Sequence, residues 1–177
     1  LGTDRRAEVA LPSGAAERRR LVVEAAEFML ERLARGPGAP LPLDVVRTQV
    51  FDCRQVTKAV LFPVRFIYTA EVGGFATNQA ASDHYGSREG RPAKVLVARA
   101  MRWRASGELD SQGEVRSALL EELVPLYEEL TRVYSEAARG AGRADLEARL
   151  LEWRRQLSSA ASARASTQGS RASLPRR

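Results

Sequence analysis

Cysteine, histidine and lysine are nearly absent from this sequence of 177 residues. The one cysteine, Cys53, excludes an internal disulfide and a zinc site built on several cysteines, and the one histidine, His84, excludes a metal motif that needs two. Only Lys58 and Lys94 are lysines, so the basic residues are almost all arginine. No apolar run approaches the ~18 residues of a membrane span, and we expect no signal peptide. We therefore expect a cytoplasmic protein with no membrane partner.

Arginine and apolar residues are what the sequence has in quantity. Its formal net charge is +6, and 44% of its residues are hydrophobic, enough to bury the core of one domain. The excess positive charge lies in residues 1–20 and 158–177, whereas residues 21–157 are neutral. A nucleic-acid-binding domain usually carries its basic excess on the folded face that meets phosphate. We therefore do not expect a nucleic-acid partner, with binding through the arginine-rich ends as an alternative.

The chain divides by composition into three parts. Residues 1–14 read as a frayed N-terminal segment, residues 15–159 as a helical domain, and residues 160–177 as a disordered tail that contains arginine. Because the first residue is Leu1 and not Met, we expect a piece of a longer protein or a processed product.

Apolar residues recur at helical spacing through the middle part, and no segment alternates as a strand would. The pattern predicts an all-α fold, an irregular bundle of about six helices. They are expected over residues 15–34, 45–71, 78–85, 92–105, 112–140 and 144–159. The expected N-caps are Ser13, Asp44, Thr77 and Ser111, the last in a capping box with Glu114.

Two of these helices contain a proline and are expected to be kinked. Pro63 lacks the N–H that would bond to the carbonyl of Ala59, a cost of about 3 kcal/mol in a helix interior. The segment is therefore either one kinked helix or two helices that meet near Leu61. Pro125 predicts a bend in the fifth helix.

Three predicted helices have clear apolar faces. These faces comprise Leu21, Val22, Ala25, Phe28, Met29 and Leu33 in the first helix; Leu119, Leu120, Leu123, Leu126, Tyr127, Leu130 and Tyr134 in the fifth; and Leu146, Leu150, Trp153 and Leu157 in the last.

Catalytic motifs are missing. There is no Gly-rich phosphate loop, no GxGxxG and no serine or cysteine in a recognisable nucleophile setting. We interpret Cys53 as a buried small apolar residue, and His84, beside Asp83, as structural and not a general base. Glu121-Glu122 and Glu128-Glu129 could act as paired acids, but we favour a solvated acidic face.

Residues 60–107 carry a more specific pattern. It runs through Arg65, Tyr68-Thr69, Gly73-Gly74, Thr77-Asn78, Ala80-Ala81 and Trp103-Arg104. This pattern resembles the C-terminal helical domain of aminoglycoside nucleotidyltransferases of the streptomycin/spectinomycin type. The close match covers about a quarter of the chain and includes no catalytic motif.

The resemblance implies the substrate- and nucleotide-binding domain of an enzyme that transfers the adenylyl group of ATP to a small hydroxylated substrate. The family's Gly-Ser followed by Asp-x-Asp is absent, because neither Gly86-Ser87 nor Gly169-Ser170 precedes such a motif. The resemblance therefore implies that ATP and Mg²⁺ bind mainly outside this chain, to a nucleotidyltransferase domain upstream of Leu1 or in a partner chain.

By this resemblance the nucleotide-binding residues are Arg65, Asn78 and Arg104. A guanidinium group suits phosphate, although a structural ion pair is an equal alternative for Arg65. Asn78 stands where the family has a lysine, so the amide would bring a hydrogen bond without charge.

The implied substrate-binding residues are Asp52, Gln55, Lys58 and Trp103. Gln55 and Lys58 stand where the family places an acid and an asparagine that face a cationic drug, and the positive charge of Lys58 disfavours an aminoglycoside. Asp52, one helical turn away, could substitute for the acid. For Trp103 we favour core packing over contact with a ligand.

The neutral body and the leucine-rich fifth helix support another class of function. In this alternative the chain is a non-catalytic helical module that binds other proteins.

Overall fold

The structure is a computed structural model that describes residues 14–33, 45–46 and 50–171, with side chains as far as residue 159. Within these residues the chain forms six helices and no strand, which confirms the predicted all-α class. The helices are α1 (Ala15–Leu33), α2 (Cys53–Val72), α3 (Asn78–Ser87), α4 (Lys94–Ser106), α5 (Gln112–Gly140) and α6 (Ala144–Arg171).

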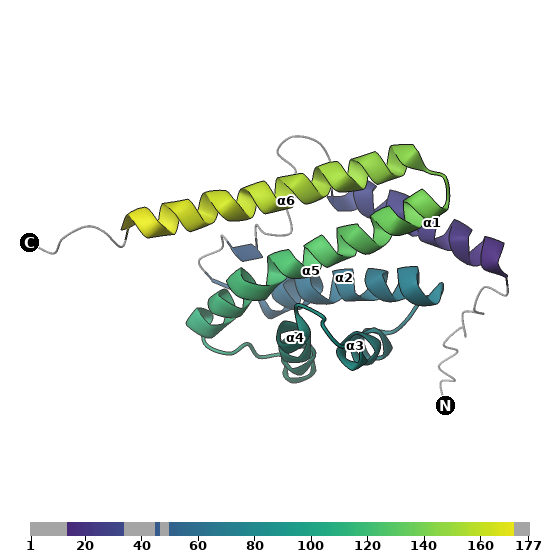
Figure 1. Ribbon diagram of the computed structural model, residues 1–177. Coiled ribbons are helices and arrows are strands. Elements are labelled where there is room, and N and C mark those ends of the chain that lie inside the picture. The colour runs from purple at the N-terminus through teal and green to yellow at the C-terminus, as the bar shows by residue number, and fades with distance from the viewer. Residues whose placement is uncertain (1–13, 34–44, 47–49, 172–177) are drawn as a thin grey trace, which may run out of the picture.

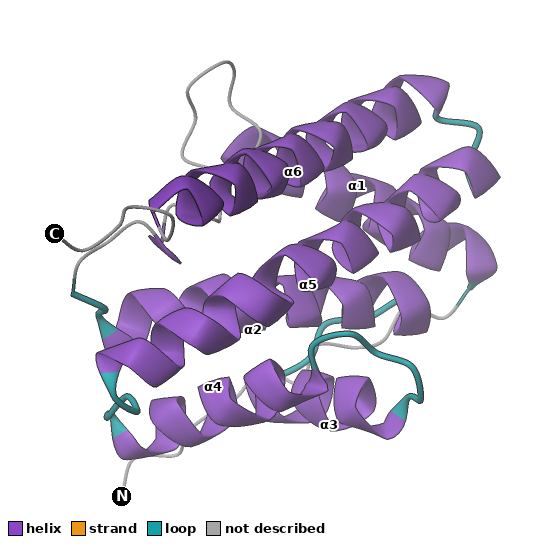
Figure 2. Cartoon of the chain, turned by 60° about the vertical axis from the view of Figure 1, so that its left-hand side comes forward, coloured by secondary structure: helices purple, strands orange, loops and turns teal. Residues whose placement is uncertain are grey.

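Helices α2 and α5 form the centre of the bundle. Helix α6 folds back along α5, while α3 and α4 cover the side of α2 that faces away from α6 (Figures 1 and 2). Helix α1 packs against α2, α5 and α6. The core lies between these layers, and its largest side chains are Trp103, Trp153, Tyr85, Tyr127 and Tyr134.

The helix ends follow local rules in most cases. The Thr77 side chain accepts a hydrogen bond from Ala80 N, and Ser111 and Glu114 form the predicted capping box. Helix α2 instead begins at Cys53, eight residues later than predicted, because the Asp52 carboxylate caps it by accepting from Gln55 N at 2.8 Å. The predicted caps Ser13 and Asp44 lie outside the described residues.

Gly73 ends α2 in the left-handed region, with φ at +78°. A Cβ atom added there would lie 2.6 Å from side-chain carbons of Arg18 in α1. The absence of a side chain therefore lets α1 pass close to the end of α2.

Both prolines lie inside continuous helices, so the alternative of two helices meeting near Leu61 is wrong. The Ala59 carbonyl, which Pro63 leaves without its usual donor, accepts a hydrogen bond of 2.8 Å from the Tyr127 hydroxyl of α5. Burial raises the pKa of the Tyr127 hydroxyl, which keeps it protonated and able to donate. A side chain of a neighbouring helix thus replaces the missing backbone donor.

The predicted apolar faces are buried for the most part. All four predicted residues of α6 are in the core, and so are six of the seven in α5. Leu120 and Phe28 are exposed, contrary to the prediction, because each lies at the edge of its helix's buried stripe. The side chain of Leu33 lies outside the description.

Helix α6 continues beyond the predicted domain boundary. Residues 160–171, expected to be disordered, are helical. Alanine, arginine and glutamine favour helix, and the first proline after α6 begins is Pro175, so no breaker except Gly169 interrupts the segment. Residues 1–13 and 172–177 of the predicted terminal segments lie outside the described residues.

We predict that Tyr127→Phe lowers the free energy of unfolding by about 1–3 kcal/mol, because the Ala59 carbonyl is left without a donor. In a Pro63→Ala background the new N–H can bond to that carbonyl, so the same substitution should cost about 1 kcal/mol less. Urea unfolding of the four proteins in this double-mutant cycle measures both effects.

Tyr134→Phe is the matched control. Its hydroxyl donates to the carbonyl of Phe66, whose backbone donor, Ala70 N–H, is present in the helix. The loss of unfolding free energy caused by Tyr134→Phe should therefore be the same with Pro63 and with Ala at this position. An equal cost of Tyr127→Phe in both backgrounds would contradict the proposed link.

Candidate functional site

A cavity of about 430 Å³ opens between α1, α2 and the loop that precedes α3. We call it the aromatic groove, because Phe28, Phe62, Phe66 and Phe75 line it. The Phe28 and Phe66 rings are nearly parallel, with centroids 6.3 Å apart, and Phe62 lies 4.5 Å from Phe66. Phe28 is 45% exposed and Phe75 56%. The groove therefore offers aromatic surface to solvent.

Arg65 and Glu24 supply the charges around this groove. Arg65 Nε donates to the Ala76 carbonyl at 3.1 Å, and Ala76 directly precedes the N-cap of α3. Among the described residues Arg65 has no carboxylate partner, so the structural ion pair considered for it is not formed there. Glu24 accepts from Arg20 Nε at 2.7 Å. Arg65 is therefore the cation of the groove that no described carboxylate balances.

The structure brings Arg65 close to Asn78 and places Arg104 elsewhere. Asn78 is the first residue of α3, two positions after the carbonyl that holds Arg65. Arg104 follows Trp103, whose carbonyl accepts from Cys53 Sγ at 3.4 Å, at the start of α2. Arg65 lies twelve residues further along α2, about 18 Å at the rise of an α-helix. The three residues predicted to bind a nucleotide thus fall into two groups.

The residues predicted to bind a substrate lie near the start of α2. Gln55 and Lys58 are exposed there, and Asp52 serves as the helix cap. Trp103 is only 1% exposed, so it offers no surface to a substrate, and the packing interpretation is confirmed. Cys53 is partly buried, and its sulfur contacts a backbone carbonyl.

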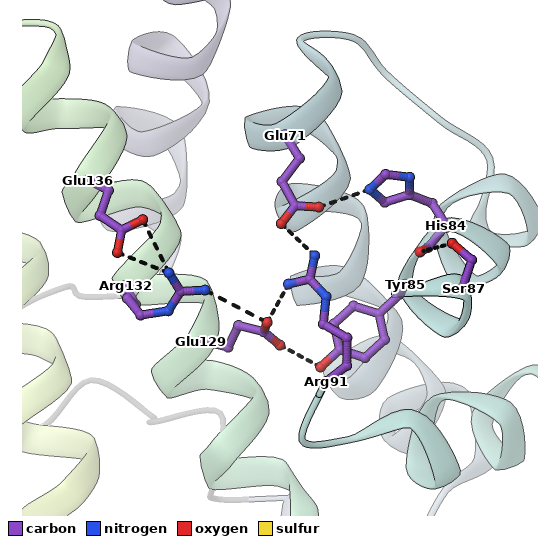
Figure 3. Close-up of polar contacts among 8 residues, drawn as sticks. All are labelled: Glu71, His84, Tyr85, Ser87, Arg91, Glu129, Arg132 and Glu136. Atoms are coloured by element: carbon purple, nitrogen blue, oxygen red, sulfur yellow. Dashed lines mark hydrogen bonds and ion pairs between the residues drawn. The ribbon is translucent and has the colours of Figure 1, made fainter. Parts of the chain in front are cut away.

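A polar cluster that the sequence did not reveal joins α2, α3 and α5 (Figure 3). The Arg91 guanidinium contacts Glu71, at the end of α2, and Glu129 of α5. The Tyr85 hydroxyl donates to Glu129 Oε2 at 2.6 Å, and His84 Nε2 lies 2.9 Å from Glu71 Oε2. We call these five residues the Arg91 cluster.

The Arg91 cluster is largely shielded from solvent. The side chains of Arg91 and Glu129 are 8% and 9% exposed, and that of Glu71 is 23% exposed. Burial and the bond to Glu129 raise the pKa of Tyr85, so its hydroxyl stays a donor. Burial alone would raise the pKa of Glu71, but hydrogen bonds from Arg91 and His84 outweigh it and hold the pKa below 4.5. Because its charges are paired and its polar groups are hydrogen-bonded, we interpret the Arg91 cluster as structural.

His84 has the contacts of a structural residue. Besides Glu71, its ring meets the edge of Tyr68, with centroids 5.2 Å apart. These contacts support the structural interpretation over that of a general base.

The prediction that four glutamates of α5 form a solvated face is wrong for three of them. Glu129 joins the Arg91 cluster, Glu128 accepts from Ser158 Oγ of α6 at 2.6 Å, and Glu122 accepts from Leu96 N of α4 at 3.0 Å. Helix α4 has no side-chain cap of its own, so Glu122 replaces it. One available signal was the spacing of Glu122 and Glu129, which places both on one face of the helix.

Searches against family models, curated proteins and solved structures found no match for this chain. In the described part no helix is long and apolar enough to cross a membrane. The same residues contain no group of three side chains suited to hold a metal ion. The aromatic groove with Arg65 is therefore the candidate site.

We predict that Arg91→Gln lowers the free energy of unfolding by about 3 kcal/mol, because it leaves Glu71 and Glu129 partly buried without their cation. Arg155→Gln is the control: its pair with Glu152 is exposed, and its loss should cost less than about 0.5 kcal/mol. Chemical denaturation measures both. Equal costs would show that the cluster adds nothing beyond a surface ion pair.

A second prediction concerns pH. The pKa of Glu71 is lowered by folding, so its contribution to stability is present above its unfolded pKa and is lost as pH falls through the folded pKa. The stability advantage of the wild type over Glu71→Gln should be full near pH 6 and shrink below about pH 4.5. Thermal unfolding across this range measures it, and an advantage that does not change with pH would refute the assignment.

Proposed function

We propose that this chain is the helical substrate- and nucleotide-binding domain of a nucleotidyltransferase. The parent enzyme would transfer the adenylyl group of ATP to a hydroxyl of a small molecule. Two things support the proposal: the resemblance over residues 60–107, and the position of Arg65 beside the first turn of α3.

The position of Arg65 is the observation on which the proposal depends. Its Nε donates to the Ala76 carbonyl, no described carboxylate pairs with its two terminal nitrogens, and the residue lines the groove. The N-terminus of α3, with its partial positive charge, starts two residues later. A guanidinium and a helix N-terminus together favour a phosphate group, and the Asn78 amide can donate a further hydrogen bond.

The fit of Mg²⁺ to the described residues of the groove is poor. Mg²⁺ prefers oxygen ligands and is usually held by one or two carboxylates together with substrate phosphates. The carboxylate of the groove, Glu24, is bonded to Arg20. We therefore assign the metal ligands and the base that accepts the hydroxyl proton to a nucleotidyltransferase domain outside this chain, and phosphate binding and orientation to Arg65 and Asn78.

Gln55 and Lys58 lie on α2 between its start and Arg65, and they extend the polar surface around Arg65 in that direction. Lys58 is seven residues before Arg65, so the two lie two turns apart on one face of the helix. Both are exposed. An anionic or uncharged substrate fits this face better than a cationic one.

The second candidate is a non-catalytic module that binds another protein. The exposed aromatic rings of Phe28 and Phe75 favour it, because exposed apolar surface is often an interaction site. Light scattering of the chain alone and with a candidate partner tests it.

We predict that Arg65→Gln weakens ATP–Mg²⁺ binding by the full-length parent protein about tenfold or more, since a charge-assisted hydrogen bond is lost. Arg104→Gln, on an exposed residue near the other end of α2, should leave the affinity unchanged. Isothermal titration measures both variants. The proposal fails if the parent does not bind ATP, or if the two substitutions weaken binding equally.

A further inference from the structure

We propose that the aromatic groove is the acceptor site and that its ligand is a hydroxylated aromatic compound without positive charge. The inference deepens the proposed function and rests on it for the reaction, because it names the class of substrate. Binding of such a compound to the groove does not itself require ATP.

The distribution of aromatic side chains is the first observation. All eleven phenylalanine, tyrosine and tryptophan residues lie in the described part of the chain. Phe28 and Phe75 are the two that are exposed, and both line the groove. Burying a Phe side chain stabilises a protein, so leaving two of them exposed in one groove forgoes stability that a bound ligand can recover.

The shape of the groove favours a small molecule over a protein surface. Its volume of about 430 Å³ lies in the range of small-molecule sites, which are mostly apolar with a few placed polar groups. Phe62 and Phe66 come from α2, Phe28 from α1 and Phe75 from the loop before α3. Rings presented from three segments around a hollow suit a flat aromatic molecule, which can stack on one ring and meet the edge of another.

The charges around the groove favour an uncharged or anionic ligand over one with several positive charges. Glu24 is already bonded to Arg20, and the Arg32 guanidinium lies 5.2 Å from the centre of the Phe28 ring. Arg65 stands at the rim without a described carboxylate partner. The arginines would repel an amino sugar with several positive charges. They would not repel a neutral or anionic aromatic ligand.

The groove also places the acceptor next to the nucleotide phosphate. Arg65 belongs both to the groove and to the phosphate-binding position beside α3. In the transfer, the ligand hydroxyl oxygen forms a bond to the α-phosphorus of ATP, and the bond to the pyrophosphate leaving group breaks. The hydroxyl proton passes to a base of the catalytic domain. An aromatic alcohol or phenol in the groove would present its hydroxyl at this rim.

The test uses the 177-residue chain and three probes of similar ring size. 1-Anilinonaphthalene-8-sulfonate is the anionic fluorescent probe, 2-naphthol the neutral hydroxylated one, and 2-naphthylmethylammonium the cationic one. We expect 2-naphthol to displace the fluorescent probe, and the cationic compound to compete at least about fivefold less well. Equal or better competition by the cation would overturn the ligand class.

Substitutions locate the site. Phe28→Ala and Phe75→Ala, both at exposed positions, should each weaken binding of the fluorescent probe about fivefold. Val95→Ala, which removes exposed apolar surface on α4, should change it less than about twofold. Arg65→Gln should weaken the sulfonate probe but not 2-naphthol. If the three groove variants bind the fluorescent probe like the wild type, the groove is not the site.

Light scattering on the same proteins tests the other occupant, a second copy of the chain. A wild-type dimer that Phe28→Ala or Phe75→Ala converts to a monomer would overturn the proposal. The ATP titration of the parent separates the two claims. Probe binding in the groove without ATP binding would refute the proposed function alone, whereas ATP binding without probe binding would refute the acceptor class alone.

Discussion

The hydrogen bond from the Tyr127 hydroxyl to the Ala59 carbonyl is the contact on which the centre of the bundle depends. Proline at position 63 removes the donor that would otherwise serve this carbonyl, and a buried carbonyl without a donor is costly. The hydroxyl of Tyr134 contacts the Phe66 carbonyl in the same way. In each helix the two contact positions are seven residues, or about two turns, apart. The later residue of α5 meets the later residue of α2, so the two helices run parallel. These two contacts set the register of α5 on α2.

That register decides which face of α2 remains for other partners. The Phe66 ring contacts Tyr134 of α5, with centroids 6.2 Å apart. Phe66 also lines the groove with Phe62 and Arg65, between α1 and the loop before α3. The groove therefore lies where α1 does not fully cover α2.

The sequence predicts features that depend on neighbours within one helix, and it does so well. The capping box at Ser111, the cap at Thr77 and the buried face of α6 all follow from residues a few positions apart. Such signals come from backbone geometry and helical periodicity, which local sequence contains.

Contacts between distant segments escape this reasoning. Arg91 meets a carboxylate twenty residues before it and another thirty-eight residues after it. The donor for the Ala59 carbonyl comes from sixty-eight residues away. An exposed glutamate and a buried one look alike in sequence, so the sequence pattern predicts that Glu129 is solvated. Periodicity likewise placed Phe28 on the apolar stripe of α1 but could not show that its part of the stripe borders a hollow and not a neighbouring helix.

The Arg91 cluster and the candidate site are linked through α3. Glu71 lies one residue before the end of α2 and His84 lies in α3, so the contact between them holds α3 against α2. The first turn of α3 follows the carbonyl that positions Arg65. A buried ion cluster adds little stability compared with apolar packing, but its geometry allows few alternative arrangements. We infer that its main effect is to give α3 one position relative to α2. The position of Arg65 in the groove then depends on the Arg91 cluster near the other end of α3, although no residue of the cluster lines the groove.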